Sequence, residues 1–118
     1  MAWSTPKTNW YGVLSQDGDY TGDFFNYTDF NRIRNNLVWL KQNYSGTVEG
    51  WVTPPGTISI GGTIRYADTQ KICTDLALLY AAITGTADPT IAPLAGTFFD
   101  YRSLNKVESL MQTLHDAL

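Results

Sequence analysis

One helix-start pattern occurs three times in the sequence, and this repeat restricts the folds that the chain can adopt. Residues 24–33 return near the end of the chain as residues 98–107, and a weaker copy runs over residues 64–72. In each copy a tyrosine stands two residues before a side chain that can cap a helix, and an apolar residue follows four residues after that cap. Such a cap accepts hydrogen bonds from unpaired N–H groups of the first turn, which stabilises a helix by about 1 kcal/mol. The repeat predicts three helices that begin alike. The alternative is a chance likeness, because all helix starts share this capping chemistry.

Each copy also carries an amide two residues after the cap. The shared positions, in the order tyrosine, cap, amide and apolar anchor, are Tyr27, Asp29, Asn31 and Ile33, then Tyr66, Asp68, Gln70 and Ile72, then Tyr101, Ser103, Asn105 and Val107. Capping does not require the amide, and asparagine is a poor residue for a first helical turn because it competes for backbone hydrogen bonds. We therefore expect the side chains of Asn31 and Asn105 to bond the backbone of an adjacent segment and to fix the orientation of their helices.

The spacing of apolar residues places the three helices. Apolar side chains recur every three or four positions over residues 29–43, 68–84 and 103–117, which is the spacing of one helical face. Gly85 is suited to end the second helix. We predict a mainly α fold in which three helices share one core, and a single domain over residues 1–118.

The other segments lack a helical period. Residues 1–28 combine proline and glycine with large aromatic side chains, which indicates an irregular N-terminal arm held by tryptophan and tyrosine. Residues 51–66 contain two β-prone pieces separated by Gly61 and Gly62, a pattern typical of a hairpin. Because each piece is short, this segment is either a short β-hairpin or an extended loop.

The charge balance argues against two classes of partner. The net charge is −3, and the 8 Lys and Arg residues are spread along the chain without a cationic run. Nucleic-acid binding depends mainly on basic residues that neutralise phosphates, and anionic membranes attract basic clusters. No apolar run approaches the roughly 18 residues that a membrane span requires. We therefore expect neither nucleic acid nor membrane as a partner.

The start of the chain and its single cysteine bear on localisation. Residues 1–7 contain no apolar stretch of the kind that a signal peptide requires, so we do not expect secretion by that route. Cys73 is the only cysteine, which excludes a disulfide within the chain. This usage favours the reducing cytoplasm or a particle assembled there.

Residue types that commonly carry catalysis are few. His115 is the only histidine and lies near the end of a predicted helix, where the helix dipole favours its charged form. Cys73 lies on an apolar helix, where cysteine behaves as a small hydrophobic residue. Residues 17–23 match the start of a calcium loop, but Thr28 stands where that loop requires Glu, which favours a solvated acidic turn. We expect a protein that is not an enzyme and that uses no cofactor or metal.

Aromatic side chains are the best candidates for a binding surface. They make up 14% of the chain while charged residues make up only 16%, and contact surfaces are likewise poor in charge and rich in aromatics. Most of the aromatic side chains should fill the core beneath the irregular segments. Trp10, Tyr11 and Trp51 are the candidates for an exposed patch that binds protein or sugar.

The N-terminal third resembles a segment found in tail-region and baseplate-region proteins of phages and prophages of Gram-positive bacteria. The likeness comprises the start Trp3-Ser4-Thr5-Pro6-Lys7-Thr8-Asn9-Trp10 and a helix opening of the form F-N-x-x-D-x-N-R-I-x-x-N, here residues 25–36. It covers about residues 3–40, and residues 41–118 add only the internal repeat. The resemblance implies a virion structural or accessory role and supplies no catalytic residue.

These observations lead to one expected function and two alternatives. We expect a non-enzymatic phage virion structural or accessory protein that binds other protein subunits, located in the virion or the host cytoplasm. Phage appendages are often symmetric, which is compatible with a homo-oligomer. The alternatives are a phage-encoded inhibitor of a host protein, such as a defence protein, and a carbohydrate-binding module for host recognition.

Overall fold

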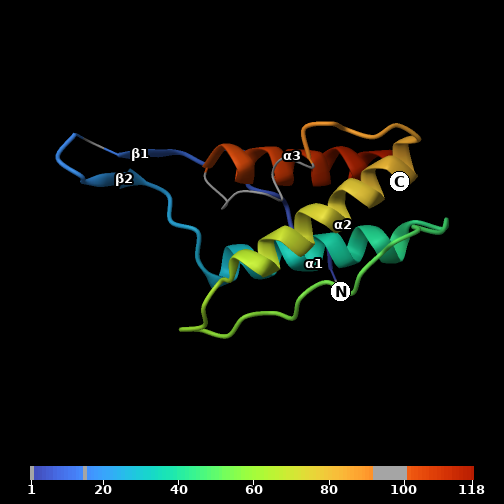
Figure 1. Ribbon diagram of the computed structural model, residues 1–118, viewed down its shortest axis with the longest axis horizontal. Helices are drawn as coiled ribbons and strands as arrows, with labels where there is room; N and C mark the ends of the chain where they lie inside the picture. The colour runs from blue at the N-terminus through green and yellow to red at the C-terminus, as the bar shows by residue number, and fades with distance from the viewer. Residues whose placement is uncertain (1, 15, 92–100) are drawn as a thin grey trace.

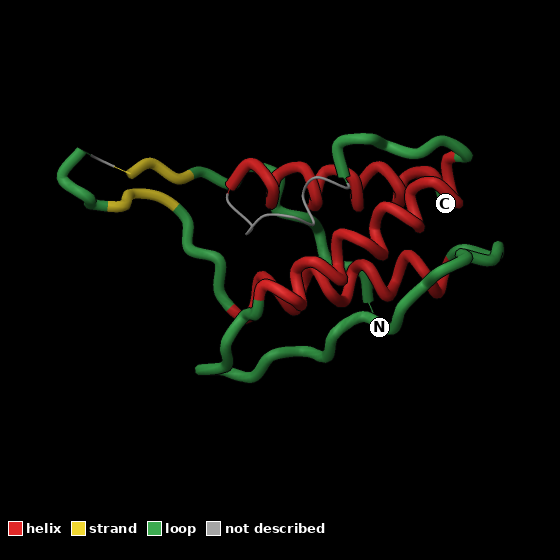
Figure 2. Tube along the Cα trace, viewed as in Figure 1, coloured by secondary structure: helices red, strands yellow, loops and turns green. Residues whose placement is uncertain are grey.

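The computed structural model describes residues 2–14, 16–91 and 101–118. Its helices are α1 (Tyr27–Asn43), α2 (Tyr66–Thr84) and α3 (Tyr101–Ala117), and two strands, β1 (Gly12–Leu14) and β2 (Tyr20–Gly22), precede them. Each helix contacts the other two, and α2 crosses in front of α1 and α3 in Figure 1. The strands form a hairpin that projects from one end of the helical body (Figure 2), so the molecule measures 50 × 30 × 24 Å.

The predicted mainly helical fold, with three helices sharing one core, is confirmed. The apolar anchors of the three repeat copies, Ile33, Ile72 and Val107, have no exposed surface and belong to one hydrophobic cluster. Burying a side chain of this size contributes about 2 kcal/mol relative to leaving it in water. The anchors therefore tie the three helix starts to one another as well as to the core.

In the part of the chain that the structure describes, each helix begins at the tyrosine of its repeat copy, two residues earlier than predicted. The first helical residues are Tyr27, Tyr66 and Tyr101. The predicted caps Asp29, Asp68 and Ser103 therefore lie inside the first turns, and their assignment as N-caps was wrong. Asp29 and Asp68 still suit these positions, because a negative charge in the first turn is stabilised by the helix dipole.

Asn26 is the cap of α1, and it acts together with Asp29. The Asn26 side chain accepts hydrogen bonds from the backbone N–H groups of Thr28 (3.1 Å) and Asp29 (3.3 Å). The Asp29 carboxylate accepts one from the backbone N–H of Asn26 at 3.2 Å, which completes a capping box. The rings of Phe25 and Phe30, which flank this turn, lie 6.5 Å apart as a hydrophobic staple requires.

The start of α2 differs from that of α1. Arg65 is the N-cap of α2, and its side chain makes no capping hydrogen bond. The residues just before α3, which include Phe98 and Phe99 of the third repeat copy, lie outside the described residues. Gly85 ends α2 as predicted, with φ of 78° and its N–H bonded to the carbonyl of Ala81. α1 and α2 thus begin at the same position of the repeat, but only α1 has a side-chain cap.

The hairpin lies in the N-terminal arm and not at residues 51–66. In the antiparallel pair β1–β2, Gly12 faces Gly22 and Val13 faces Thr21. Residues 16–19 make the turn, where Gly18 adopts φ of 85°. The arm was predicted to be irregular because three-residue strands are too short to show an alternating pattern.

Residues 51–65 form an extended loop beside α1, so the hairpin alternative for this segment is wrong. The amide of Asn31 donates to the carbonyl of Ile58 (2.8 Å) and accepts from the N–H of Ile58 (2.7 Å). Arg34 donates from Nε to the carbonyl of Pro55 at 2.9 Å. The Asn31 side chain therefore satisfies the backbone groups of Ile58 that a hairpin would have paired within the segment.

Candidate protein-binding site

The N-terminal arm is held across α1 and α3 by asparagine side chains. Asn36 of α1 accepts from the N–H of Ser4 (3.0 Å) and donates to its carbonyl (2.8 Å). Asn105 of α3 does the same with Trp10, at 2.6 Å and 2.9 Å. Each amide thus pairs with one residue of an extended segment as a neighbouring strand would. The predicted bonding of Asn31 and Asn105 to backbone is confirmed, while Gln70 makes no equivalent pair among the described residues.

A fully buried carboxylate joins the arm to both helices. Glu108 of α3 has no exposed surface. It accepts hydrogen bonds from Nε (2.8 Å) and Nη2 (3.0 Å) of Arg32, from the backbone N–H of Lys7 (3.1 Å), and from the indole N–H of Trp10. Four donors therefore compensate the cost of burying this charge.

Arg32 links this cluster to the start of α1. Its Nη1 donates to Asp29 at 2.9 Å, while the same guanidinium pairs with Glu108. Burial works to lower the pKa of the Arg32 guanidinium, but its hydrogen bonds to Glu108 and Asp29 and their charges raise that pKa overall. Arg32 is therefore a permanent positive charge between two carboxylates, and it also lies 5.9 Å from the centre of the Trp10 ring.

The first residues of the arm end in an aromatic cluster. Trp3 stacks on His115 of α3, with ring centroids 4.3 Å apart, and lies 5.2 Å from the ring of Trp39 on α1. Pro6, between Trp3 and Trp10, is buried. The arm is thus anchored at three points along its length, and its backbone is bonded between them.

The hairpin carries exposed apolar rings where it leaves the helical body. Tyr11 is 55% exposed and Phe24 is 71% exposed. Next to Phe24, Asp23 donates its backbone N–H to the carbonyl of Tyr11 (2.8 Å), and the Asp23 carboxylate accepts a hydrogen bond from the Tyr11 N–H (3.0 Å). Lys7 forms an ion pair with Asp23 at 3.4 Å, which ties the base of the hairpin to the arm.

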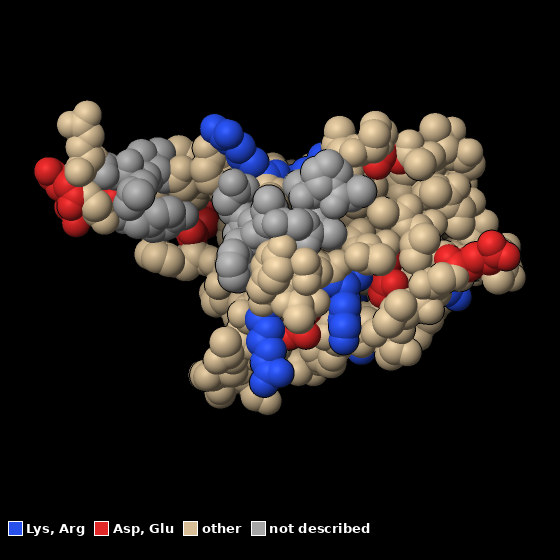
Figure 3. Space-filling view, in the orientation of Figure 1, with Lys and Arg blue, Asp and Glu red and all other residues tan. Residues whose placement is uncertain are grey.

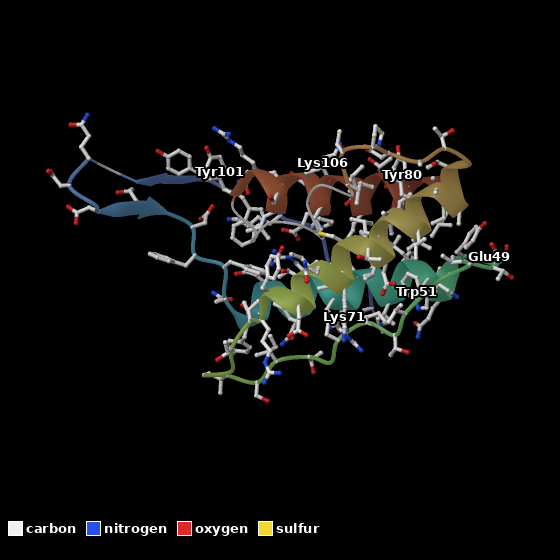
Figure 4. The ribbon with its side chains drawn as sticks, in the orientation of Figure 1. Glu49, Trp51, Lys71, Tyr80, Tyr101 and Lys106 are labelled. Atoms are coloured by element: carbon white, nitrogen blue, oxygen red, sulfur yellow. The ribbon has the colours of Figure 1, made fainter. Side chains whose placement is uncertain are left out.

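The three predicted surface aromatics do not form one patch. Trp10 is buried, at 5% exposure, because its indole N–H reaches Glu108, so its assignment to an exposed patch was wrong. Tyr11 is exposed as predicted. Trp51 is half-buried beside Lys41, whose Nζ lies 5.8 Å from the ring centre. Figure 4 shows Trp51 and Tyr101 at opposite ends of the helical body. The hairpin lies at the end where α3 begins, which is the end of Tyr101 (Figure 1).

Sequence reasoning missed three residues of this region. Asn36 and Glu108 are polar side chains that the helical spacing places among buried apolar residues, and that mismatch was the available signal. Phe24 belongs to the repeat, but no property of the sequence distinguished its exposed ring from the partly buried ring of Phe25.

A second buried carboxyl lies between α2 and the loop that follows α1. Asp75 has no exposed surface, and its Oδ1 accepts from the N–H of Val52 at 3.1 Å. Its Oδ2 has no hydrogen-bond partner in the described part of the chain. Burial raises the pKa of this carboxyl, and the hydrogen bond from Val52 offsets that effect only in part.

The remaining candidates for chemistry are located as follows. Cys73 has no exposed surface, and burial raises the pKa of its thiol to about 12. His115 stacks on Trp3, and its Nδ1 lies 3.3 Å from Asp116. Over residues 2–14, 16–91 and 101–118, no group of three His, Cys, Asp or Glu side chains could hold a metal ion. None of the described helices is long and apolar enough to cross a membrane.

Comparison with known proteins gives no relative for this arrangement. No family model matches the chain, and no curated protein or solved structure matches it significantly.

Proposed function

We propose that this protein is a non-enzymatic structural or accessory protein of a phage virion, and that it acts by contacting other protein subunits. The observation that carries the proposal is the hairpin β1–β2. The hairpin projects beyond the helices (Figure 1). Tyr11 directly precedes β1 and Phe24 follows β2 by two residues, and both rings are exposed.

The hairpin has the properties of a contact element. A two-stranded hairpin is marginally stable in water on its own, and a strand edge can pair with a strand of another chain. Phe24 offers an apolar ring at a place where burial by a partner would remove it from water. Asp17 and Asp19 are exposed in the turn, and acidic side chains gather at this tip in Figure 3. The expected partner surface therefore combines an apolar pocket with basic groups nearby.

The sequence resemblance supports membership of a virion. Each residue that carries the resemblance in the helix opening is used either to begin α1 or to hold another segment against it. These residues are Phe25, Asn26, Asp29, Asn31, Arg32, Ile33 and Asn36. The shared pattern thus corresponds to one physical arrangement, in which α1 receives extended segments along its sides.

The test is recovery of partners by the tagged full chain from cells that produce the phage encoding it. We expect virion subunits to be recovered by the wild type and lost with Phe24→Ser. Ile60→Ser is the matched control, because Ile60 is 81% exposed but lies in the loop before α2. Recovery of no virion protein, or equal recovery with both variants, would contradict the proposal.

Partner recovery and a separate fluorescence measurement distinguish the alternatives. A host protein recovered in place of virion subunits would favour inhibition of that host protein. Binding to cell-wall sugars, read from tryptophan fluorescence, would favour a carbohydrate module. The geometry does not favour the sugar alternative, because Trp10 is buried and Trp51 is half-buried.

A further inference from the structure

The arm is bound to the helices as a separate peptide would be. Five backbone groups of residues 4–10 are bonded by side chains of α1 and α3: the N–H and carbonyl of Ser4, the N–H of Lys7, and the N–H and carbonyl of Trp10. Pro6 and Trp10 are buried against the body. Five backbone bonds and two buried side chains are what a groove provides to an extended ligand.

The repeat gives this binding a direction. Asn31 of α1 holds Ile58, which belongs to the segment that leads into α2. Asn105 stands at the same repeat position in α3, and it holds Trp10, which belongs to the segment that leads into α1. In both cases the amide of one helix binds the segment that precedes the next helix, where the helices are taken in the cyclic order α1, α2, α3 and again α1. The amide of α3, the last helix, therefore binds the N-terminal segment of the chain.

We propose that this cycle also closes between two molecules, so that the arm and β1 of one copy bind α1 and α3 of a second copy. Every contact of the arm described above is available in the same form from a second copy, because all of these contacts join residues 2–14 to other parts of the chain. Such exchange of an identical element is a low-cost route to a symmetric dimer. The inference goes beyond the proposed function and does not depend on membership of a virion.

The turn of the hairpin is the hinge of the exchange. In the closed chain, residues 16–19 reverse direction between β1 and β2, and Gly18 has a φ of 85°. In the exchanged dimer these residues run from one copy to the other, β1 pairs with β2 of the partner copy, and the left-handed conformation is no longer required. The equilibrium between the closed monomer and the exchanged dimer then depends on the conformational energy of the turn and on protein concentration.

The first test uses this difference. A Cβ at Gly18 meets no atom within 4 Å, so Gly18→Val strains the closed turn without a steric clash. A left-handed residue with a Cβ costs about a tenfold change in an equilibrium constant, and two hinges open per dimer. We expect light scattering to show a dimer dissociation constant about a hundredfold lower for Gly18→Val than for the wild type. Gly56→Val is the control, since it also meets no atom and its φ is not left-handed.

The second test asks which chain holds the arm. Thr8 and Ser109 are exposed, and they are the chain neighbours of the bonded residues Lys7 and Glu108. Chains carrying Thr8→Cys and chains carrying Ser109→Cys are unfolded, mixed, refolded at high concentration and joined with a short bis-maleimide. Cys73 is buried and does not compete. We expect a mixed dimer with Ser109→Cys but not with Glu49→Cys, which is also exposed and lies after α1.

The outcomes are distinct. A mixed dimer specific to Ser109→Cys, with enhanced dimerisation of Gly18→Val, supports the exchange. Monomers at every concentration for both glycine variants overturn it, and so does a mixed dimer of equal yield with Glu49→Cys. Neither readout uses a virion protein, so this proposal and the proposed function fail independently.

Discussion

Glu108 of α3 and Arg32 of α1 form an ion pair with two hydrogen bonds, 2.8 Å and 3.0 Å long. The same carboxylate accepts hydrogen bonds from the backbone of Lys7 and from the indole of Trp10. One side chain therefore sets the positions of α1, α3 and the arm relative to one another.

Removing this carboxylate should be costly. We expect Glu108→Ala to lower the free energy of unfolding by about 3 kcal/mol, because it leaves a partly buried guanidinium and an indole N–H without their acceptor. Urea unfolding measures the change. Glu49→Ala is the control: Glu49 is the only other glutamate and is exposed, so its removal should change stability by less than about 0.5 kcal/mol. Equal effects of the two substitutions would contradict the role of Glu108.

The amide pair at the arm gives a second prediction. Asn105→Ala removes two hydrogen bonds to Trp10 and should cost about 2 kcal/mol in urea unfolding. It should also speed hydrogen exchange at the Trp10 amide, which reports release of the arm. Gln70→Ala, at the same repeat position of α2, should cost less than about 0.5 kcal/mol. The prediction fails if the Trp10 amide remains as protected as in the wild type.

Asp75 predicts a dependence of stability on pH. Burial raises the pKa of its carboxyl above the ordinary value of 3.8, so the folded chain keeps this proton at pH values where the unfolded chain has lost it. The contribution of this carboxyl to the free energy of unfolding is fully present at pH values below its ordinary pKa. It is lost as the pH rises through the pKa of the folded state. Asp75→Asn retains an acceptor for Val52, and it should raise the free energy of unfolding at pH 7 by on the order of 1 kcal/mol. This gain should shrink toward pH 3 in urea unfolding, and a gain that grows on acidification would show the sign to be wrong.

The helix caps offer a matched pair of substitutions. Asn26→Ala removes the acceptor of two first-turn N–H groups of α1 and should cost about 1 kcal/mol. Arg65→Ala changes the N-cap of α2, where the side chain makes no capping hydrogen bond, and thermal unfolding should change little. If both variants lose the same stability, the capping box of α1 does not contribute as described.

The repeat was a reliable guide to what the helices share, because core anchors and helix starts depend on local order along the chain. Ile33, Ile72 and Val107 meet in the core, and Asn31 and Asn105 bond extended segments, as their positions predicted. Caps were harder to assign. Both members of a capping box are capping residues, so the sequence around Asn26 fits a helix start at either of two positions.

The arm could not be predicted for a different reason. Its hairpin has strands of three residues, and the backbone bonds of Ser4, Lys7 and Trp10 come from side chains 32 to 101 positions away. No local pattern contains such a partner. The same limit applies to Trp10, whose burial depends on a carboxylate supplied by the last helix.

Asn36 and Asn105 bind the arm through its peptide groups, and the side chains of Ser4, Thr5, Thr8 and Asn9 point into solvent. Substitutions at those four positions should therefore affect folding less than substitutions at the two amides. The outer face of the arm can therefore be substituted, and can recognise new surroundings, without disturbing the helices that hold it.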